Sequence, residues 1–291
     1  MNTALLEVND LTATLVTRKQ RLRLLDGVTF NIEPGRALGL VGESGSGKSL
    51  TTRAITRLLD PAFRVGGQIS FQGTDVLSMN AAALRSYRLT RVGMIFQDPR
   101  AHINPVYRVG DFLTEALVLG RGMDRGQAED RAITLLEEVG VRNASSRLRQ
   151  YPHELSGGLL QRVMIASVLL AEPELILADE PTTALDVTAQ SDVMAILEEQ
   201  RRIRGMSLLL ITHDLELAAA CCDELAVMYA GQIVEQGAGI HENPSHPYTT
   251  QLLEARPSIE SKSDRLPTLS YTREDHEAWK STRFDAQEVS A

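Results

Sequence analysis

The chain has 291 residues, of which 43% are hydrophobic and 23% charged, so it has enough apolar residues for a substantial core. Its 38 acidic residues outnumber its 30 basic ones, and the formal net charge of −8 argues against a nucleic-acid partner, because phosphate backbones require clustered Lys and Arg. The two cysteines, Cys221 and Cys222, are adjacent, which excludes a disulfide framework and a spaced metal site.

The start of the chain is polar and acidic, so we expect no secretory signal peptide. The longest largely apolar run, Val163–Ala171, is far shorter than the roughly 20 residues that a membrane-spanning helix needs. We therefore expect any association with a membrane to occur through a partner.

The first third of the chain is typical of short strands separated by turns. The predicted strands are Leu5–Val8, Ala13–Val16, Val28–Ile32, Ala37–Val41, Gly66–Phe71 and Val92–Phe96. A glycine-rich loop follows the apolar strand Ala37–Val41, and the pattern predicts a helix over Lys48–Leu59.

Helical periodicity dominates from Val109 to Leu170, which predicts a helical insert. One apolar face of this insert comprises Ala128, Ala132, Leu135, Leu136 and Val139. Strands and helices then alternate, which favours an α/β fold with a largely parallel sheet and helices on both faces. The expected elements are the strands Leu175–Ala178 and Leu208–Ile211, the helices Thr188–Arg202 and Leu215–Cys222, and a hairpin of Leu225–Tyr229 and Gly231–Glu235. The polar tail Glu260–Ala291 is expected to be extended or partly disordered.

A phosphate-binding loop is the strongest motif, because it matches G-x-x-x-x-G-K-[ST] and stands between a predicted strand and a predicted helix. Its residues are Gly42, Glu43, Ser44, Gly45, Ser46, Gly47, Lys48 and Ser49. Glycines let successive backbone N–H groups face phosphate oxygens, and the helix N-terminus adds partial positive charge. We expect Lys48 to reach the β- and γ-phosphates and the Ser49 hydroxyl to ligate Mg²⁺.

Two carboxylates follow the apolar strand Leu175–Ala178. Asp179 and Glu180 are expected at the strand ends of the sheet, on the side of the phosphate loop. In this position Asp179 would hold Mg²⁺ and Glu180 would act as the general base that polarises the attacking water.

A third motif, Leu155-Ser156-Gly157-Gly158, precedes Gln161-Arg162. With the two motifs above, it resembles the L-S-G-G-Q signature of the nucleotide-binding subunits of ABC transporters. The resemblance implies that Ser156, Gly157 and Gly158 bind the γ-phosphate of a nucleotide held by a second subunit in a head-to-tail dimer. Leu159 stands where the family has Gln, although the Ser-Gly-Gly core is intact.

The same resemblance assigns further residues to the site. Gln97 corresponds to the Q-loop glutamine that ligates Mg²⁺, Asp186 lies in the D-loop sequence Ala184-Leu185-Asp186, and His213 corresponds to the switch histidine. The resemblance thus implies Glu180, His213 and Gln97 as catalytic residues, and Ser49, Gln97 and Asp179 as metal ligands. The residues expected to contact ATP are Gly42, Glu43, Ser44, Gly45, Ser46, Gly47, Lys48, Ser49, Leu50, Ser156, Gly157, Gly158 and Asp186.

The family resemblance also implies a domain organisation. Residues 1–98 and 172–238 would form an ABC-type P-loop NTPase core with an antiparallel β subdomain, and residues 99–171 the helical subdomain. Residues 239–291 would form a C-terminal extension and polar tail.

Within the ABC superfamily, the chain is most similar to the ATPases of oligopeptide, dipeptide and nickel importers. The stretches Phe96-Gln97-Asp98-Pro99, Ile103-Asn104-Pro105, Tyr151–Glu154 and His246-Pro247-Tyr248-Thr249 carry this resemblance. Many members of the group have several cysteines after the His-Pro-Tyr motif, whereas this chain has none beyond Cys222, so we expect no iron–sulfur cluster. The solute therefore stays open between peptides and nickel or another small solute.

The family that the chain resembles usually stacks adenine on an aromatic side chain in the loop before Val28, but Thr12–Asp26 contains no Phe, Tyr or Trp. Leu15 or Val16 could pack on the base, or Arg18 or Arg21 could stack on it.

The resemblance implies a peripheral protein at the cytoplasmic face of the cell membrane. Its partners would be integral-membrane permease subunits, an identical or homologous second ATPase subunit and, indirectly, a solute-binding protein. Two alternatives are a soluble ABC ATPase that works on nucleic acid or ribosomes and an accessory protein of a metabolic complex. The absence of a second ATPase domain and the acidic net charge disfavour the first.

Overall fold

The computed structural model describes residues 4–183, 185–254 and 284–285. The chain forms two compact units. Unit 1 comprises Met1–Ser78 and Leu210–Ala291, and unit 2 comprises Met79–Leu209. The domain boundaries expected from the sequence stay a prediction.

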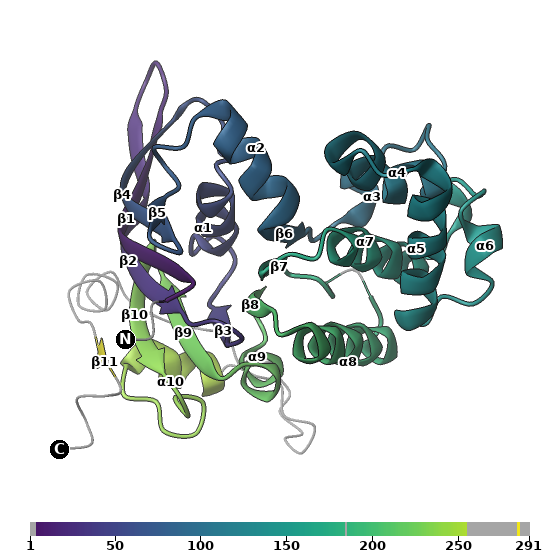
Figure 1. Ribbon diagram of the computed structural model, residues 1–291. Helices are drawn as coiled ribbons and strands as arrows, with labels where there is room; N and C mark the ends of the chain where they lie inside the picture. The colour runs from purple at the N-terminus through teal and green to yellow at the C-terminus, as the bar shows by residue number, and fades with distance from the viewer. Residues whose placement is uncertain (1–3, 184, 255–283, 286–291) are drawn as a thin grey trace. The chain divides into compact units, whose positions relative to one another are not determined.

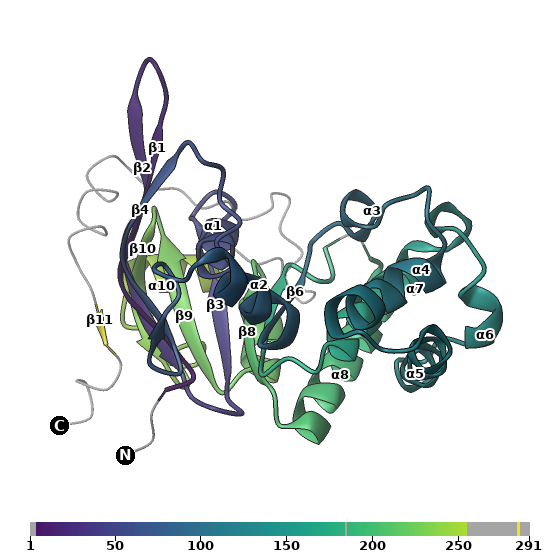
Figure 2. The ribbon, with the colours of Figure 1, turned by 45° about the horizontal axis from the view of Figure 1, so that its top comes forward.

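Unit 1 contains an antiparallel sheet with the strand order β2-β1-β4-β5. Its strands are β1 (Leu6–Val16), β2 (Arg21–Ile32), β4 (Phe63–Phe71) and β5 (Thr74–Asp75). In Figures 1 and 2, β1 and β2 form a long ribbon that projects at the turn between them. β1 joins two segments that the sequence predicted as separate strands. A shift in register between Val8 and Leu11 accommodates the polar residues between these segments within one strand. Asp10 takes a left-handed backbone there, with φ of 48°.

A second group of strands in unit 1 carries the phosphate loop. β3 (Ala37–Val41) is buried along its whole length and pairs in parallel with β9 (Glu224–Tyr229). β9 forms an antiparallel hairpin with β10 (Gln232–Gly237), which confirms the predicted hairpin. β10 also pairs with the short β11 (Phe284–Asp285), whereas the rest of the predicted polar tail lies outside the described residues.

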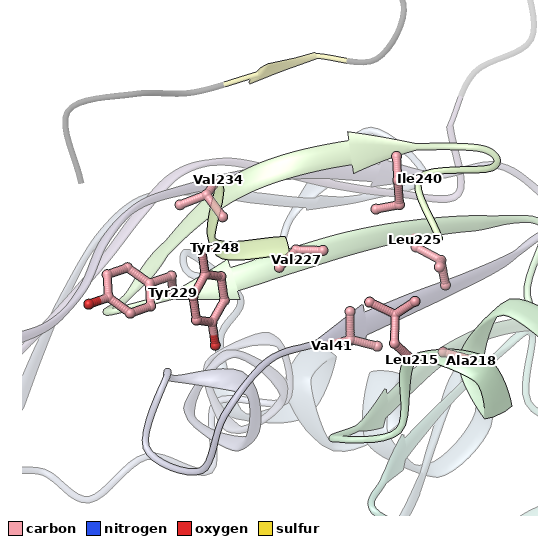
Figure 3. Close-up of a cluster of buried hydrophobic side chains, with 9 residues drawn as sticks. All are labelled: Val41, Leu215, Ala218, Leu225, Val227, Tyr229, Val234, Ile240 and Tyr248. Carbon is pink, nitrogen blue, oxygen red and sulfur yellow. The ribbon is translucent and has the colours of Figure 1, made fainter. Parts of the chain in front are cut away.

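The helices of unit 1 are α1 (Lys48–Ile55), α9 (Leu215–Cys221) and α10 (Pro247–Glu254). α1 ends four residues before the predicted Leu59, and Arg57 then adopts a left-handed φ of 52°. α9 packs on β3 and β9. Figure 3 shows a buried cluster formed by these elements, α10 and the hairpin. Its members are Val41, Leu215, Ala218, Leu225, Val227, Tyr229, Val234, Ile240 and Tyr248.

Unit 2 contains the parallel pair β6 (Val92–Ile95) and β7 (Leu175–Asp179). β7 is buried along its whole length, as its continuous apolar sequence predicts for a strand covered on both faces. α2 (Ala81–Thr90) packs on β6 and was not predicted. Asn80 caps this helix by accepting a hydrogen bond from the Ala83 amide. The start of the helix is therefore marked by this cap and not by a long apolar face. β8 (Ser207–Thr212) carries the chain from unit 2 into unit 1.

The predicted helical insert is confirmed as a group of separate helices in unit 2. They are α4 (Val109–Glu115), the π-helix η1 (Ala116–Gly120), α5 (Arg125–Glu138), α6 (Ala144–Arg147), the 3₁₀-helix η2 (Pro152–Glu154) and α7 (Gly157–Leu170). The short α3 (Pro99–His102) precedes the insert, and α8 (Val187–Arg204) follows it and confirms the separately predicted helix Thr188–Arg202. α4, α5 and α7 pack on one another, and all five residues of the predicted apolar face are buried. Within the described residues, no helix is both long and apolar enough to span a membrane.

Candidate functional site

The phosphate loop occupies the connection between β3 and α1 in unit 1, as the motif predicts. Gly47 is the N-cap of α1 and has φ of 114°, a conformation that L side chains rarely adopt. A Cβ atom at Gly42 would lie 2.2 Å from the Met228 carbonyl oxygen. Glycine is therefore required at Gly47 by backbone conformation and at Gly42 by the closeness of β9.

Lys48 lies at the first position of α1 and is buried. Its Nζ donates hydrogen bonds to the carbonyl oxygens of Gly42 at 2.7 Å and Glu43 at 2.8 Å. The ammonium group is thereby held against the loop, where its charge would attract a phosphate.

Three features show that the loop fits a phosphate group. The N-terminus of α1 has no side-chain cap and no acidic residue in its first turn, so its partial positive charge is not offset locally. The Ser46 Oγ is buried and has no hydrogen-bond partner among the described residues. A Cβ atom added to Gly45 would meet no heavy atom within 4 Å, so there is room for a ligand beside this residue.

Two hydrogen bonds tie the loop to the C-terminal part of unit 1. The Gly231 amide, between β9 and β10, donates to the Ser46 carbonyl at 2.8 Å. The Glu43 amide donates to the Tyr248 hydroxyl at 3.1 Å. Burial raises the pKa of the Glu43 carboxyl, and nearby Lys48 partly offsets this effect. The sequence marked Tyr248 as part of a family motif, but no pattern indicated its contact with a residue 205 positions away.

The two acidic residues lie at the carboxyl end of β7 in unit 2. Asp179 is the last residue of the strand and is buried, and Glu180 follows it. Glu180 Oε2 accepts hydrogen bonds from Gln97 Nε2 at 3.0 Å and from Thr183 Oγ1 at 2.7 Å. The structure therefore brings together Gln97 and Glu180, and it adds Thr183, which the sequence analysis did not select.

Glu180 has φ of 46°, in the left-handed region that a glutamate rarely occupies. Such a conformation costs on the order of 1–3 kcal/mol and is concentrated at functional sites. The bend turns the chain out of β7 directly at the carboxylate, which places Thr183, three residues later, within hydrogen-bond distance of it.

The Ser-Gly-Gly motif begins α7 in unit 2. Ser156 is the N-cap of this helix, and its Oγ accepts a hydrogen bond from the Leu159 amide at 3.4 Å. A Cβ atom at Gly158 would meet no heavy atom within 4 Å, so this side of the helix N-terminus is open. Leu159 donates only its backbone amide to the cap, which explains why a residue other than Gln is compatible with the local structure.

Asp186 and His213 lie at the beginnings of two other helices. Asp186 is the N-cap of α8 and accepts a hydrogen bond from the Ala189 amide at 2.9 Å, whereas the D-loop residue Ala184 lies outside the described residues. His213 follows β8 in unit 1 and is exposed. Asp214, the next residue, caps α9 through the amides of Glu216 and Leu217.

Comparison with known proteins identifies the family. The profile of the ABC transporter family matches residues 25–183, a range that contains the phosphate loop, the Ser-Gly-Gly motif and both strand-end carboxylates. The chain belongs to this family. It is therefore an ATP-binding cassette with the ATPase chemistry that the sequence motifs predict.

Named relatives of this cassette are transport proteins. The chain is 43% identical over 267 residues to the oligopeptide transport ATP-binding protein OppD of Salmonella typhimurium, which covers 91% of this chain and 80% of OppD. It is 44% identical over 269 residues to the dipeptide transport ATP-binding protein DppD of Haemophilus influenzae, covering 91% and 82%. These relatives confirm the resemblance to peptide importer ATPases.

Solved cassettes share the fold. The dimeric ATP-binding cassette MJ0796 bound to ADP and Pi superposes with a TM-score of 0.72 at 26% identity, covering 80% of this chain and 98% of MJ0796. CbiO1 from Clostridium perfringens, part of the ABC transporter complex CbiONQ, gives a TM-score of 0.69 at 26% identity, covering 82% and 90%. The predicted α/β fold of the ABC ATPases is therefore confirmed.

The four candidates for adenine contact lie around the turn of the β1–β2 ribbon in the cassette. Leu15 pairs with Leu22 and Val16 pairs with Arg21. Leu15 and Val16 are half-buried, whereas Arg18 and Arg21 are exposed. The choice between an aliphatic and an arginine contact stays a prediction.

Among the described residues, no group of three or more His, Cys, Asp or Glu side chains is arranged so that it could hold a metal ion. Magnesium is usually bound by one or two carboxylates together with water and substrate phosphates, so such a cluster is not required. The predicted ligands Ser49, Gln97 and Asp179 offer a hydroxyl, an amide and a carboxylate oxygen, which are donors that suit Mg²⁺.

Proposed function

We propose that the chain is the ATP-hydrolysing subunit of an importer that takes up oligopeptides or dipeptides across the cytoplasmic membrane. The observation that carries this proposal is the 41–44% identity to OppD and DppD proteins over about nine-tenths of the chain. The shared segment includes both halves of the proposed nucleotide chemistry, the phosphate loop and the carboxylates at the end of β7.

Binding of ATP would begin at the phosphate loop. Backbone N–H groups of Gly45–Ser49 would donate to phosphate oxygens, and Lys48 would compensate the charge of the β- and γ-phosphates. Ser49, Gln97 and Asp179 would hold Mg²⁺, which would neutralise phosphate charge when bound. The support for this ligand set is the donor chemistry of the residues and their place in the family motifs.

Hydrolysis requires a base that is held in a fixed orientation. Hydrogen bonds from Gln97 and Thr183 both end on Glu180 Oε2 and restrict the rotation of the carboxylate. We assign Glu180 as the general base for the attacking water, and His213 as the residue that contacts the γ-phosphate.

A second ATPase subunit would complete each site. Ser156, Gly157 and Gly158 at the N-terminus of α7, together with Asp186, would face the nucleotide of the partner in a head-to-tail dimer. The dimeric form of the MJ0796 cassette supports this arrangement. Permease subunits would hold the dimer at the cytoplasmic face of the membrane, with a solute-binding protein on the other side.

Transport can be tested in cells that lack their own peptide uptake. We expect the chain, co-expressed with a permease and a solute-binding protein from the same genome, to restore uptake of labelled di- and oligopeptides. The Lys48→Ala variant should restore none, because its phosphate loop lacks the charge that holds ATP. ATP-dependent uptake of nickel but not of peptides would refute the peptide assignment, and failure of the chain to co-purify with the permease would refute the transport role.

A further inference from the structure

The His-Pro-Tyr segment, His246–Tyr248, follows the β9–β10 hairpin in unit 1 and contacts the phosphate loop. Tyr248, in the first turn of α10, is fully buried, although a tyrosine carries a polar hydroxyl. Its ring lies against that of Tyr229 at the end of β9, with 4.5 Å between ring centroids (Figure 3). A buried tyrosine hydroxyl normally has a hydrogen-bond partner, and here that partner is the amide of Glu43 in the phosphate loop.

A buried carboxylate fixes the start of this segment. Glu235 on β10 is only 1% exposed, and its two oxygens accept hydrogen bonds from the amides of Ser245 at 2.7 Å and His246 at 3.2 Å. His246 Nδ1 then accepts a hydrogen bond from the Tyr248 amide at 3.1 Å. Glu235 and His246 thus hold the backbone from which the tyrosine side chain extends.

The Glu43 residue links this segment to the phosphate-binding lysine. Its amide donates to Tyr248 at 3.1 Å, and its carbonyl oxygen accepts from Lys48 Nζ at 2.8 Å. The orientation of Glu43 between Gly42 and Ser44 therefore depends on the tyrosine on one side and the lysine on the other. Because Gly42 lacks a side chain that would restrict its backbone, an external hydrogen bond is an effective way to fix the loop.

We propose that Tyr248 is a positioning residue for the phosphate loop, and that the His-Pro-Tyr segment sets the affinity for ATP through this hydroxyl. The proposal rests on the ATP-binding function argued above. Tyr248 does not touch the nucleotide in this scheme. It acts through the Glu43 backbone, and its ring packing on Tyr229 is a separate, purely structural contribution.

The test is to remove the hydroxyl and keep the ring. In the full-length protein, Tyr248→Phe should raise the Kd for MgATP about 5- to 10-fold, the size expected when one hydrogen bond that orders a binding loop is lost. The KM for ATP should rise by a similar factor while kcat changes little, because the hydroxyl acts on binding and not on the reacting groups. The melting temperature without nucleotide should stay close to that of the wild type.

Thr249→Val is the matched control. Thr249 is the next residue of α10, it is equally buried, and its Oγ1 has no hydrogen-bond partner among the described residues. This substitution replaces a buried hydroxyl by a methyl group of similar size, and it removes no hydrogen bond to the phosphate loop. It should leave the Kd unchanged, and an equal rise in both variants would overturn the proposal by showing a general effect of disturbing α10.

A double-mutant cycle supplies a readout that a merely structural role would not move. Glu235→Gln weakens the attachment of the segment and should also raise the Kd for MgATP. It should raise the Kd little further in the Tyr248→Phe background, because the hydrogen bond from the segment to the phosphate loop is already absent there. Full additivity of the two effects, or an unchanged Kd in Tyr248→Phe, would overturn the proposal. Lys48→Ala serves as the reference for lost binding, and a wild-type chain that binds MgATP no better than this variant would refute the ATP site itself.

Discussion

In the proposed ATPase, the phosphate loop and the strand-end carboxylates would carry out different parts of the same chemistry, and the structure builds them by different means. The loop in unit 1 relies on backbone groups, a helix N-terminus and one lysine, and glycine is required at Gly42 and Gly47. The carboxylate site in unit 2 relies on side chains, with Gln97 and Thr183 both bonded to Glu180.

This difference predicts how each region responds to mutation. A backbone-built loop tolerates changes at side chains that do not support its backbone, because the N–H groups stay in place as long as the supporting contacts hold. In a site built from side chains, the rate of hydrolysis depends strongly on one functional group. Loss of a hydrogen bond that supports this group should lower the rate by a smaller factor.

Replacing the general base should have the largest effect. Glu180→Gln keeps the size of the side chain and removes the carboxylate, so ATP should still bind while kcat for hydrolysis falls by at least about 100-fold. Single-turnover hydrolysis and MgATP binding, measured on the same preparation, separate the two steps. Near-normal hydrolysis by this variant would remove Glu180 from the role of base.

Weakening the support of the base should have an intermediate effect. Thr183→Val removes the hydrogen bond to Glu180 Oε2 and leaves the one from Gln97, so we expect kcat to fall about 5- to 10-fold with an unchanged Kd for MgATP. Thr134→Val on the exposed face of α5, whose hydroxyl bonds to the Asp130 carbonyl, is the control and should leave kcat unaltered. If both variants keep the wild-type kcat, Gln97 alone orients the carboxylate.

The half-buried carboxyl of Glu43 in the loop should matter least. Burial raises the pKa of Glu43, so the folded state disfavours its charged form and the charge costs stability above that pKa. Glu43→Gln should therefore give a slightly higher melting temperature than the wild type at neutral pH. The difference should disappear as the pH falls below the ordinary range of a glutamate carboxyl, where both folded and unfolded chains are protonated.

A contrary pH trend in that comparison would show that the attraction of Lys48 outweighs burial at Glu43. Binding of MgATP should be nearly the same in Glu43→Gln and the wild type, because the loop uses the Glu43 backbone rather than its carboxylate. A large loss of binding would contradict the contrast between the two regions.

Local sequence patterns predicted most of the fold that surrounds the site. The apolar strands Ala37–Val41 and Leu175–Ala178 and the hairpin after Leu225 were confirmed because burial on both faces and turn residues leave clear signals. The joined strand β1, the early end of α1 and the short helix α2 were missed. Each depends on local backbone irregularities or on a helix cap, and hydrophobic periodicity reports neither.

The phosphate loop, the pair Asp179–Glu180 at the end of a buried strand and the Ser-Gly-Gly helix start can all be found in the sequence, because each motif consists of neighbouring residues. The contacts that support these motifs are visible only in the folded chain. Gln97 lies 83 positions before Glu180, and Tyr248 lies 205 positions after Glu43. Such contacts depend on how strands and helices pack, and no local spacing in the sequence records them.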